Sequence, residues 1–155
     1  MTMKRRMFLK GSMAAGTVGV AVGAGLLTPG SVLAAWPKAA MEARSVDDAL
    51  KGIGMSGATE SGDVKIKAPD IAENGAVVPI TISTKLSNVE AIAVLVEKNP
   101  QPLACSFDFD KSAEGFVSTR IKMGKTSDIV AVVKSGGKLF SSNKTVKVTI
   151  GGCGG

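Results

Sequence analysis

From residue 63 to residue 150, apolar and polar residues alternate in short runs that Gly, Pro and Asn residues interrupt. This period of two is typical of half-buried β-strands. Val78, Ile80 and Ile82 share one face of such a strand, in which Pro79 has no N–H to donate and so indicates an edge position or a bulge. Further strands are predicted within 64–67, 92–96, 103–109, 116–123, 129–133, 139–140 and 146–150.

Two of these strands have a distinctive pattern. Residues 129–133 are continuously apolar, which indicates a central strand and leads us to expect an apolar patch for a partner. Leu103 and Cys105 are in phase with two phenylalanines and are expected on one face of their strand. About seven or eight short strands with regular turn signals, such as Asn74-Gly75, predict an all-β, immunoglobulin-like antiparallel β-sandwich.

A short helix and a linker are predicted ahead of the sandwich. Ser45 is a suitable N-cap for a helix over 45–51, and Gly52 is a suitable end. Residues 52–62 are rich in Gly and Ser, which is typical of a linker. We therefore divide the chain after its first 34 residues into a helix and linker at 35–62, a β-sandwich domain at 63–150 and a flexible C-terminal arm at 151–155.

Residues 1–34 are expected to form a twin-arginine export signal. Arg5 and Arg6 are followed by Phe-Leu-Lys and then by a long, weakly apolar stretch without charge. A retained membrane anchor is the alternative, but the many glycines make a poor spanning helix. Cleavage after Ala34 or Ala35 would place the mature chain in the periplasm, with no membrane association.

Removal of the signal changes the charge of the chain. The 155 residues include 19 Lys and Arg against 13 Asp and Glu, but four basic residues leave with the signal, so that 15 against 13 remain. A net charge of +2 gives no reason to expect a nucleic-acid partner. The chain has no His, the commonest general base and transition-metal ligand, which disfavours a hydrolase or a metalloenzyme. We expect no metal and no cofactor.

The most informative segment is the end of the chain, Gly151-Gly152-Cys153-Gly154-Gly155. Glycine has little conformational preference, and fixing it costs entropy, so that this tail suits a mobile arm better than an ordered structure. From Ile150 to Cys153 the arm reaches roughly 10 Å when extended. No histidine, adjacent cation or helix N-terminus that would activate the thiol is recognisable, so we expect partner sites to supply its reactivity. Whether Lys144 and Lys147 on the preceding strand contribute is left open.

Cys105 leaves an alternative open. Its phase fits a free, buried thiol that behaves as a small hydrophobic side chain. A Cys105–Cys153 disulfide is the rival interpretation, and the chain would then be a periplasmic structural or adhesion sandwich. A ubiquitin-like sulfur carrier, which also ends in Gly-Gly, is disfavoured because such carriers use a terminal thiocarboxylate made in the cytosol.

The lysines of the predicted strands are most simply charges that face solvent. Lys65, Lys67, Lys122 and Lys125 belong to this group. A role for one of them in docking an acidic partner is the alternative.

Four stretches of the chain are similar to one known family. The segment Val146-Lys147-Val148-Thr149-Ile150, leading into Gly-Gly-Cys-Gly-Gly, is highly specific, and residues 71–80, 97–100 and 119–123 support it. On these residues the chain resembles the SoxY family, the sulfur carriers of the periplasmic thiosulfate-oxidising (Sox) system. The resemblance runs over essentially the whole mature chain and includes the export signal.

The resemblance implies a non-enzymatic carrier with several partners. Proteins of this family pair with SoxZ, a second sandwich protein without a signal, so we expect a heterodimer or a larger assembly that is exported already folded. A c-type cytochrome joins their terminal cysteine to thiosulfate, a hydrolase releases sulfate, and in some organisms a sulfane dehydrogenase oxidises the remaining persulfide. By this match Cys153 is the covalent attachment site, and Gly151, Gly152, Gly154 and Gly155 form the carrier arm.

Overall fold

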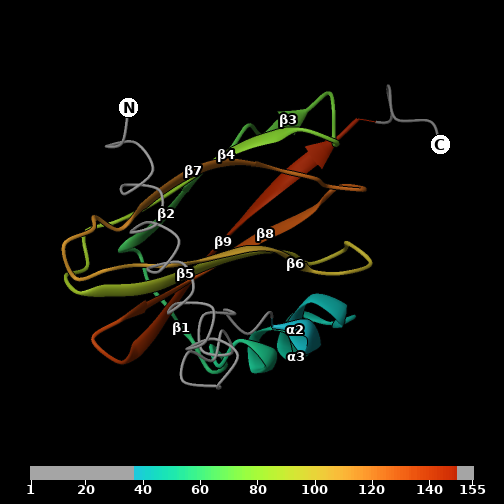
Figure 1. Ribbon diagram of the computed structural model, residues 1–155. Coiled ribbons are helices and arrows are strands. Elements are labelled where there is room, and N and C mark those ends of the chain that lie inside the picture. The colour runs from blue at the N-terminus through green and yellow to red at the C-terminus, as the bar shows by residue number, and fades with distance from the viewer. Residues whose placement is uncertain (1–36, 150–155) are drawn as a thin grey trace, which may run out of the picture. The chain divides into compact units, whose positions relative to one another are not determined.

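The computed structural model describes residues 37–149 of the chain (Figure 1). The predicted export signal and the predicted arm lie outside these residues. Within them, two short helices, α2 (Lys38–Glu42) and α3 (Val46–Gly52), precede the strands. The strands are β1 (Thr59–Glu60), β2 (Val64–Lys67), β3 (Ile71–Ala72), β4 (Val78–Thr84), β5 (Val89–Val96), β6 (Leu103–Asp108), β7 (Phe116–Ile121), β8 (Ser127–Ser135) and β9 (Lys138–Val148).

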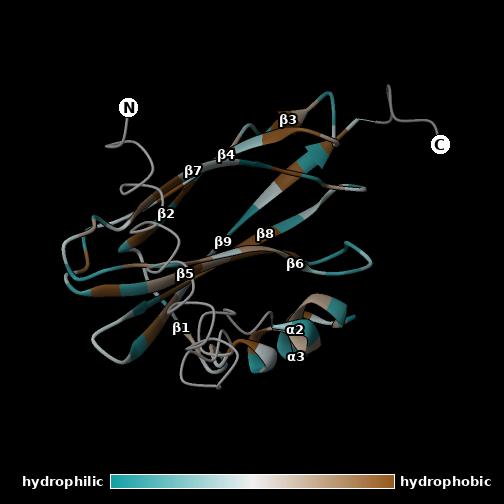
Figure 2. Cartoon of the chain, viewed as in Figure 1, coloured by the Kyte–Doolittle hydropathy of each residue, from teal (hydrophilic) through white to brown (hydrophobic). Residues whose placement is uncertain are grey.

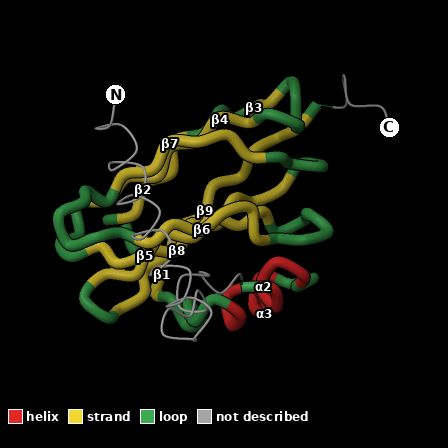
Figure 3. The backbone as a smooth tube through the Cα atoms, viewed as in Figure 1, coloured by secondary structure: helices red, strands yellow, loops and turns green. Residues whose placement is uncertain are grey.

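The strands form two sheets that face each other (Figure 3). In the larger sheet the order is β1-β9-β8-β5-β6, and β3 also pairs with β9; in the smaller sheet the order is β2-β4-β7. All pairs are antiparallel except those of β1 and β3, which run parallel to β9. The predicted immunoglobulin-like sandwich is confirmed, and two short parallel pairs at one edge are added to the expected antiparallel arrangement.

The main hydrophobic core lies between the two sheets. Val78, Ile80 and Ile82 form the predicted apolar face of β4, and all three are buried. Ile92 on β5 and Ile129 on β8 belong to the same cluster from the opposite sheet. Figure 2 shows hydrophilic and hydrophobic bands succeeding each other along β9. Burial of the apolar positions, at roughly 25 cal/mol per Å², is the main contribution that stabilises the sandwich.

The two helices cover the other face of the larger sheet (Figures 1 and 3). Leu95 and Val132 on that face form a second hydrophobic cluster with Ala40 of α2 and Leu50 of α3. Residues 129–133 are therefore covered on both faces, as their continuous apolar run indicated. The expectation that they leave an apolar patch for a partner is wrong, because the helices of the chain itself cover it.

The segment predicted as a helix and linker at 35–62 contains more structure than expected. The predicted helix is present as α3, and Ser45 Oγ accepts a hydrogen bond from the N–H of Asp48 at 3.1 Å. β1 then pairs with β9, and Thr59 lies opposite Phe140. The Gly and Ser residues around β1 do not prevent its pairing with β9, because strand pairing at the edge of a sheet uses backbone groups alone.

Pro79 lies on a central strand, which corrects the edge position expected for it. β4 runs between β2 and β7, and Pro79 is opposite Arg120 of β7. The N–H of Thr84 donates to Gly115 O, on the side of β7, at 2.9 Å. Backbone N–H groups point alternately to the two neighbouring strands, so the N atoms of odd-numbered residues in β4 point toward β2. β2 ends opposite Thr81, and the missing N–H of Pro79 therefore interrupts no ladder.

Leu103 and Cys105 do not share a face as predicted. Cys105 is opposite Val94 of β5, but Leu103 is opposite Leu95, so that one additional residue of β6 lies between two consecutive pairs. This bulge turns Leu103 toward the helices, where it packs in the second cluster. Cys105 stays on the other face and packs against the core between the sheets.

β8 and β9 form a hairpin. Gly136 and Gly137 make its turn with positive φ angles of 53° and 74°, as the Gly-Gly signal predicted. The separate strands expected at 139–140 and 146–150 are joined in a single strand of 11 residues, β9, which ends at Val148; residue 150 lies outside the described residues. β9 carries the chain along the larger sheet toward the terminal tail.

Candidate functional site

The tail that the sequence singles out lies outside the described part of the chain. Its predicted site residues are Gly151, Gly152, Cys153, Gly154 and Gly155. The structure describes the chain as far as Thr149, so the candidate site is built here from the strand that leads to the tail. We call Val148, the last residue of β9, and Thr149, which follows it, the arm base.

Hydrogen bonds hold the end of β9 on both edges. On one edge β8 is paired with β9 in continuous antiparallel register as far as Val146, two residues before the arm base. On the other edge β3 is parallel to β9: the N–H of Lys147 donates to Asp70 O at 3.0 Å, and the N–H of Thr149 donates to Ala72 O at 3.1 Å. The backbone of Thr149 is therefore fixed to the sandwich.

Side chains add to this attachment. Thr126, in the connection between β7 and β8, accepts a hydrogen bond at its Oγ1 from the N–H of Val148 at 2.9 Å. Lys144 Nζ lies 3.0 Å from Asp70 Oδ1, and this ion pair joins β9 to the segment that enters β3. Because the Asp70 side chain is 89% exposed, the ion pair adds little to stability and serves mainly to orient that segment.

Gly75 brings the β3–β4 connection against the arm base. Asn74 Oδ1 accepts a hydrogen bond from the N–H of Ala76 at 2.9 Å, which confirms the predicted Asn-Gly turn. Gly75 O accepts a hydrogen bond from the N–H of Met123 at 2.7 Å. A Cβ atom at Gly75 would collide with Met123 O and would lie 2.8 Å from Val148 Cγ1. This close approach therefore requires glycine.

Positive charge prevails around the arm base. Three exposed lysines lie there and take part in none of the ion pairs between described residues: Lys122, Lys125 and Lys147. The acidic residues nearby are Glu73, Asp70, which is already paired with Lys144, and Asp128, which accepts a hydrogen bond from Thr145 Oγ1. An anionic partner or substrate near the tail would thus be attracted to this end of the sandwich.

Two large apolar residues are exposed beside the arm base. Ile71 on β3 is 56% exposed and lies opposite Lys147, and Val77, just before β4, is 49% exposed. Exposed apolar residues next to a functional segment are typical of surfaces that contact other proteins. They give the end of the sandwich an apolar as well as a basic character.

Cys105 has the properties of a packing residue. Its thiol is free, half-buried and packed against the core between the sheets. Burial raises the pKa of this thiol to about 11, so that at neutral pH it is protonated and weakly nucleophilic. Cys105 thus packs as a small hydrophobic side chain, but it is half-buried, not buried as expected.

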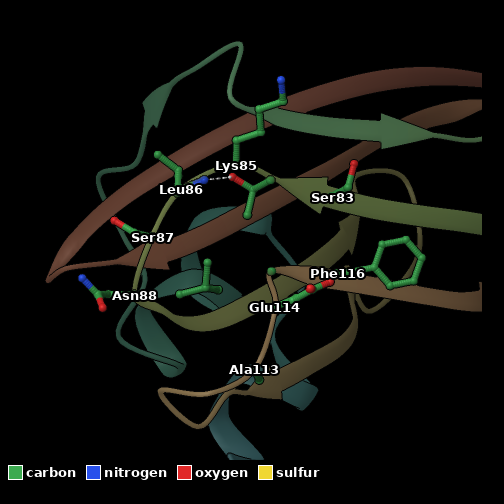
Figure 4. A pocket seen from close by; sticks show the side chains of 11 residues that line it. Ser83, Lys85, Leu86, Ser87, Asn88, Ala113, Glu114 and Phe116 are labelled. Carbon is green, nitrogen blue, oxygen red and sulfur yellow. Dashed lines mark hydrogen bonds between the residues drawn. The ribbon is translucent and has the colours of Figure 1, made fainter.

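A surface pocket of about 380 Å³ lies at the other end of β4 (Figure 4). Figure 4 shows Leu86 and Asn88, from the β4–β5 connection, across from Glu114 and Phe116, at the start of β7. The seven residues of β4, at roughly 3.3 Å each, separate this pocket from the arm base by about 20 Å. No site residue predicted from the sequence lines it.

The described residues offer a scaffold rather than a reaction centre. No group of three or more His, Cys, Asp or Glu side chains within residues 37–149 is arranged to hold a metal ion. In the same residues, no helix has the length and apolar character needed to cross a membrane. Fold and site together define an immunoglobulin-like sandwich protein whose last strand is anchored directly ahead of a cysteine-bearing tail.

Comparison with known proteins identifies the family. The family model of the sulfur oxidation protein SoxY matches residues 51–153. The chain is also similar to the solved structure of the sulfur carrier protein SoxY from Chlorobium limicola f thiosulfatophilum. The identity is 39% and the TM-score 0.59, over 66% of this chain and 96% of that one. This chain belongs to the SoxY family.

A second likeness concerns the fold alone. A variant of the superoxide reductase (neelaredoxin) from Ignicoccus hospitalis is 19% identical, with a TM-score of 0.51, over 64% of this chain and 87% of that one. The comparison with curated proteins gave no match. The sandwich fold is thus shared with a superoxide reductase, and only the similarity to SoxY bears on function.

Sequence reasoning did not find the residues that hold the arm base. Ala72 and Thr126 act through hydrogen bonds to β9 across 77 and 22 positions of the chain, which no local pattern reveals. Gly75 was recognised as part of a turn, but its contact with Val148 is tertiary. A signal that could have been used is the resemblance of residues 71–80 to the family, since this stretch includes β3 and the turn.

We predict that Gly75→Ala lowers the free energy of unfolding by about 1–3 kcal/mol, because the new Cβ must displace Met123 or Val148. Hydrogen exchange at the N–H of Thr149 should become faster. Gly124→Ala is the matched control, since its Cβ would meet only Asn99 Oδ1, at 3.7 Å. Urea unfolding and exchange rates measure both variants, and equal effects would contradict the role of Gly75.

We predict that an alkylating reagent at about pH 8 modifies Cys153 while Cys105 stays protected, because only the thiolate reacts. Burial raises the Cys105 pKa from 9.0 to about 11, so its stabilising contribution is complete below pH 9 and is lost as the pH rises toward 11. Peptide mass mapping as a function of pH follows both thiols. Equal labelling of the two cysteines in the folded chain at about pH 8 would contradict this assignment.

Proposed function

We propose that this chain is the sulfur carrier of a periplasmic thiosulfate-oxidising system, with the substrate bound covalently to Cys153. The observation that carries the proposal is the arm base. β8 pairs with β9 as far as Val146, and the N–H groups of Val148 and Thr149 then donate to Thr126 Oγ1 and Ala72 O, one residue ahead of the glycine tail. Membership in the SoxY family supports it. The free, half-buried Cys105 gives no support to the alternative of a Cys105–Cys153 disulfide.

The proposed arm is short and has a fixed origin. From Thr149 to Cys153 the chain can extend by roughly 13–14 Å. Glycines on both sides of Cys153 leave the thiol without neighbouring side chains, so that a narrow active site can admit it. The thiol is thereby confined to a small region at one end of the sandwich, which raises its effective concentration for any enzyme docked there.

The chemistry of the carrier can be written as two balanced steps. In the first, the Cys153 thiol forms an S–S bond with the sulfane sulfur of thiosulfate. This oxidation releases one proton to solvent and two electrons, and a c-type cytochrome accepts the electrons. In the second, water cleaves the bond between the outer sulfur and the sulfonate group, sulfate leaves, and a persulfide remains on Cys153. A sulfane dehydrogenase is the proposed next acceptor. The chain itself is a substrate carrier, and its partners are the enzymes.

Two further parts of the proposal concern assembly and compartment. A SoxZ-like subunit is the proposed constant partner, and it gives a reason for twin-arginine export, because that route carries folded cargo. Residues 1–34 are proposed to be removed after export. Size-exclusion chromatography of periplasmic material tests the first point, and the mass of the mature chain tests the second: a monomer, or a chain that retains residues 1–34, would contradict them.

We predict that periplasmic material from thiosulfate-grown cells carries a sulfur adduct on the peptide containing Cys153, and that a reductant removes it. Cys153→Ser should abolish the adduct and thiosulfate oxidation. Cys105→Ser is the matched control and should leave both unchanged, because Cys105 is half-buried and its raised pKa keeps the thiol protonated at neutral pH. Intact-mass and peptide-mass spectrometry measure the outcome. An adduct that persists in Cys153→Ser would sink the proposal.

We predict that Gly152→Val slows adduct formation at least about tenfold, because a branched side chain beside the thiol stiffens the arm and fills the cleft that must admit it. The free energy of unfolding should change by less than about 0.5 kcal/mol. Gly62→Val is the matched control, since nothing lies within 4 Å of its Cβ position. Initial rates with purified partner enzymes measure the effect, and an unchanged rate would speak against a mobile arm.

A further inference from the structure

The outward face of the smaller sheet has an unusual composition. In β2, β4 and β7 the side chains alternate, and the inward ones, such as Val64, Ile80 and Val117, are buried in the core. We call the outward set the basic face. It consists of Lys65, Lys67, Pro79, Thr81, Ser83, Phe116, Ser118 and Arg120.

The charges of the basic face are all positive. Lys65, Lys67 and Arg120 are exposed, and none of them takes part in an ion pair between described residues. The nearest acidic residues in sequence are Asp63 and Glu114, which precede β2 and β7 at the end of the sheet next to the pocket of Figure 4, and Asp70, which follows Lys67 by three positions and is paired with Lys144. None of these carboxylates forms an ion pair with a cation of the basic face.

The strand register brings the cations together. Lys67 lies opposite Thr81, Thr81 lies opposite Ser118, and Arg120 lies opposite Pro79. With neighbouring strands about 4.8 Å apart, the two outer strands of the sheet are about 10 Å apart, close to the Debye length at physiological salt. The electrostatic fields of the cations on the two outer strands therefore reinforce each other above the sheet. Between them, the hydroxyls of Thr81 and Ser118 are 3.3 Å apart and offer further hydrogen-bonding groups.

The basic face continues to the arm base. β7 ends at Ile121, and Lys122 follows Arg120 by two positions. The next residue, Met123, donates its N–H to Gly75 O, and the Cβ position of Gly75 is 2.8 Å from Val148 Cγ1. A protein that lies on the basic face thus reaches the end of the sandwich from which the tail extends.

We propose that the basic face docks an acidic surface of the enzyme that receives the arm. The proposal rests on the carrier function proposed above, and charge complementarity carries it. Long-range attraction raises the rate of association, whereas a small polar contact lets the complex dissociate quickly. A carrier that is passed from enzyme to enzyme needs both properties.

The composition of the face favours a transient partner over the constant subunit. Permanent interfaces are more hydrophobic, whereas this face consists mostly of cations and hydroxyl groups. Phe116, 55% exposed, and Pro79 are its apolar members. Phe116 and Arg120 are of residue types that are enriched at protein interfaces, and they lie toward opposite ends of β7.

The test compares two triple charge reversals in the mature chain bound to its constant subunit. Lys65→Glu, Lys67→Glu and Arg120→Glu reverse the basic face. Lys38→Glu, Arg44→Glu and Lys138→Glu are the matched control, with the same change of net charge at exposed positions away from that face and from the arm base. The rate of thiosulfate addition to Cys153 by the purified c-type cytochrome is measured at low and at high salt.

We expect the face variant to lower kcat/KM about 10- to 100-fold at low salt, with kcat retained and the difference vanishing at high salt. The control should change less than about threefold. If the triple variant does not fold, the neutral pair Lys67→Gln and Arg120→Gln should show a smaller loss in the same direction.

Equal slowing by both triple variants, or no slowing by either, would overturn the docking proposal. Loss of the constant subunit from the face variant, detected by size-exclusion chromatography, would overturn it too, since the face would then be the permanent interface. These outcomes leave the carrier function intact as long as the wild-type chain acquires the adduct. Absence of the adduct from the wild-type chain would instead refute the carrier function.

Discussion

The attachment of the last strand on both of its edges is the constraint on which the rest of the structure depends. β8 holds β9 on one edge, and Asp70 and Ala72 accept hydrogen bonds from Lys147 and Thr149 on the other. A thiol on a short tether samples a small volume only if the origin of the tether is fixed. The short parallel strand β3 thus has a function beyond completing the sheet, because it sets the point from which the proposed arm extends.

The layers of the sandwich make this attachment rigid. The larger sheet is covered on one face by the smaller sheet and on the other by α2 and α3, so that β5 and β8 are buried on both sides. Movement of β9 would therefore disturb a packed core, which costs far more than the loss of a single hydrogen bond. In the proposed carrier, the rigid scaffold and the glycine tail have separate tasks: the sandwich would position the thiol and offer a docking surface, and the tail would insert the thiol.

The sequence predicts the elements better than their arrangement. Alternation correctly identified the buried face of Val78, Ile80 and Ile82, because side-chain direction along a strand is a local property. It misplaced Pro79, because the cost of a proline depends on where the neighbouring strand ends. It placed Leu103 on the wrong face, because a bulge reverses the phase.

The candidate site divides in the same way. Cys153 and its glycines are recognisable from composition and spacing alone, and their role remains a prediction. The partners of the arm base are not recognisable, because Ala72 and Thr126 reach β9 through tertiary hydrogen bonds. Lys65 and Lys67 were correctly expected to face solvent, but the strand register was needed to show that they share a face with Arg120.

Nitrogen-15 relaxation of the amide groups along the last residues of the mature chain tests the central claim most directly. We predict order parameters of about 0.85 for Lys147 and Thr149, typical of a rigid backbone, followed by a sharp fall below about 0.6 from Gly151 to Gly155. High order through Cys153 would mean that the sandwich holds the thiol in place. A fall that begins within β9 would mean that the arm has no fixed origin, and either result would contradict the claim.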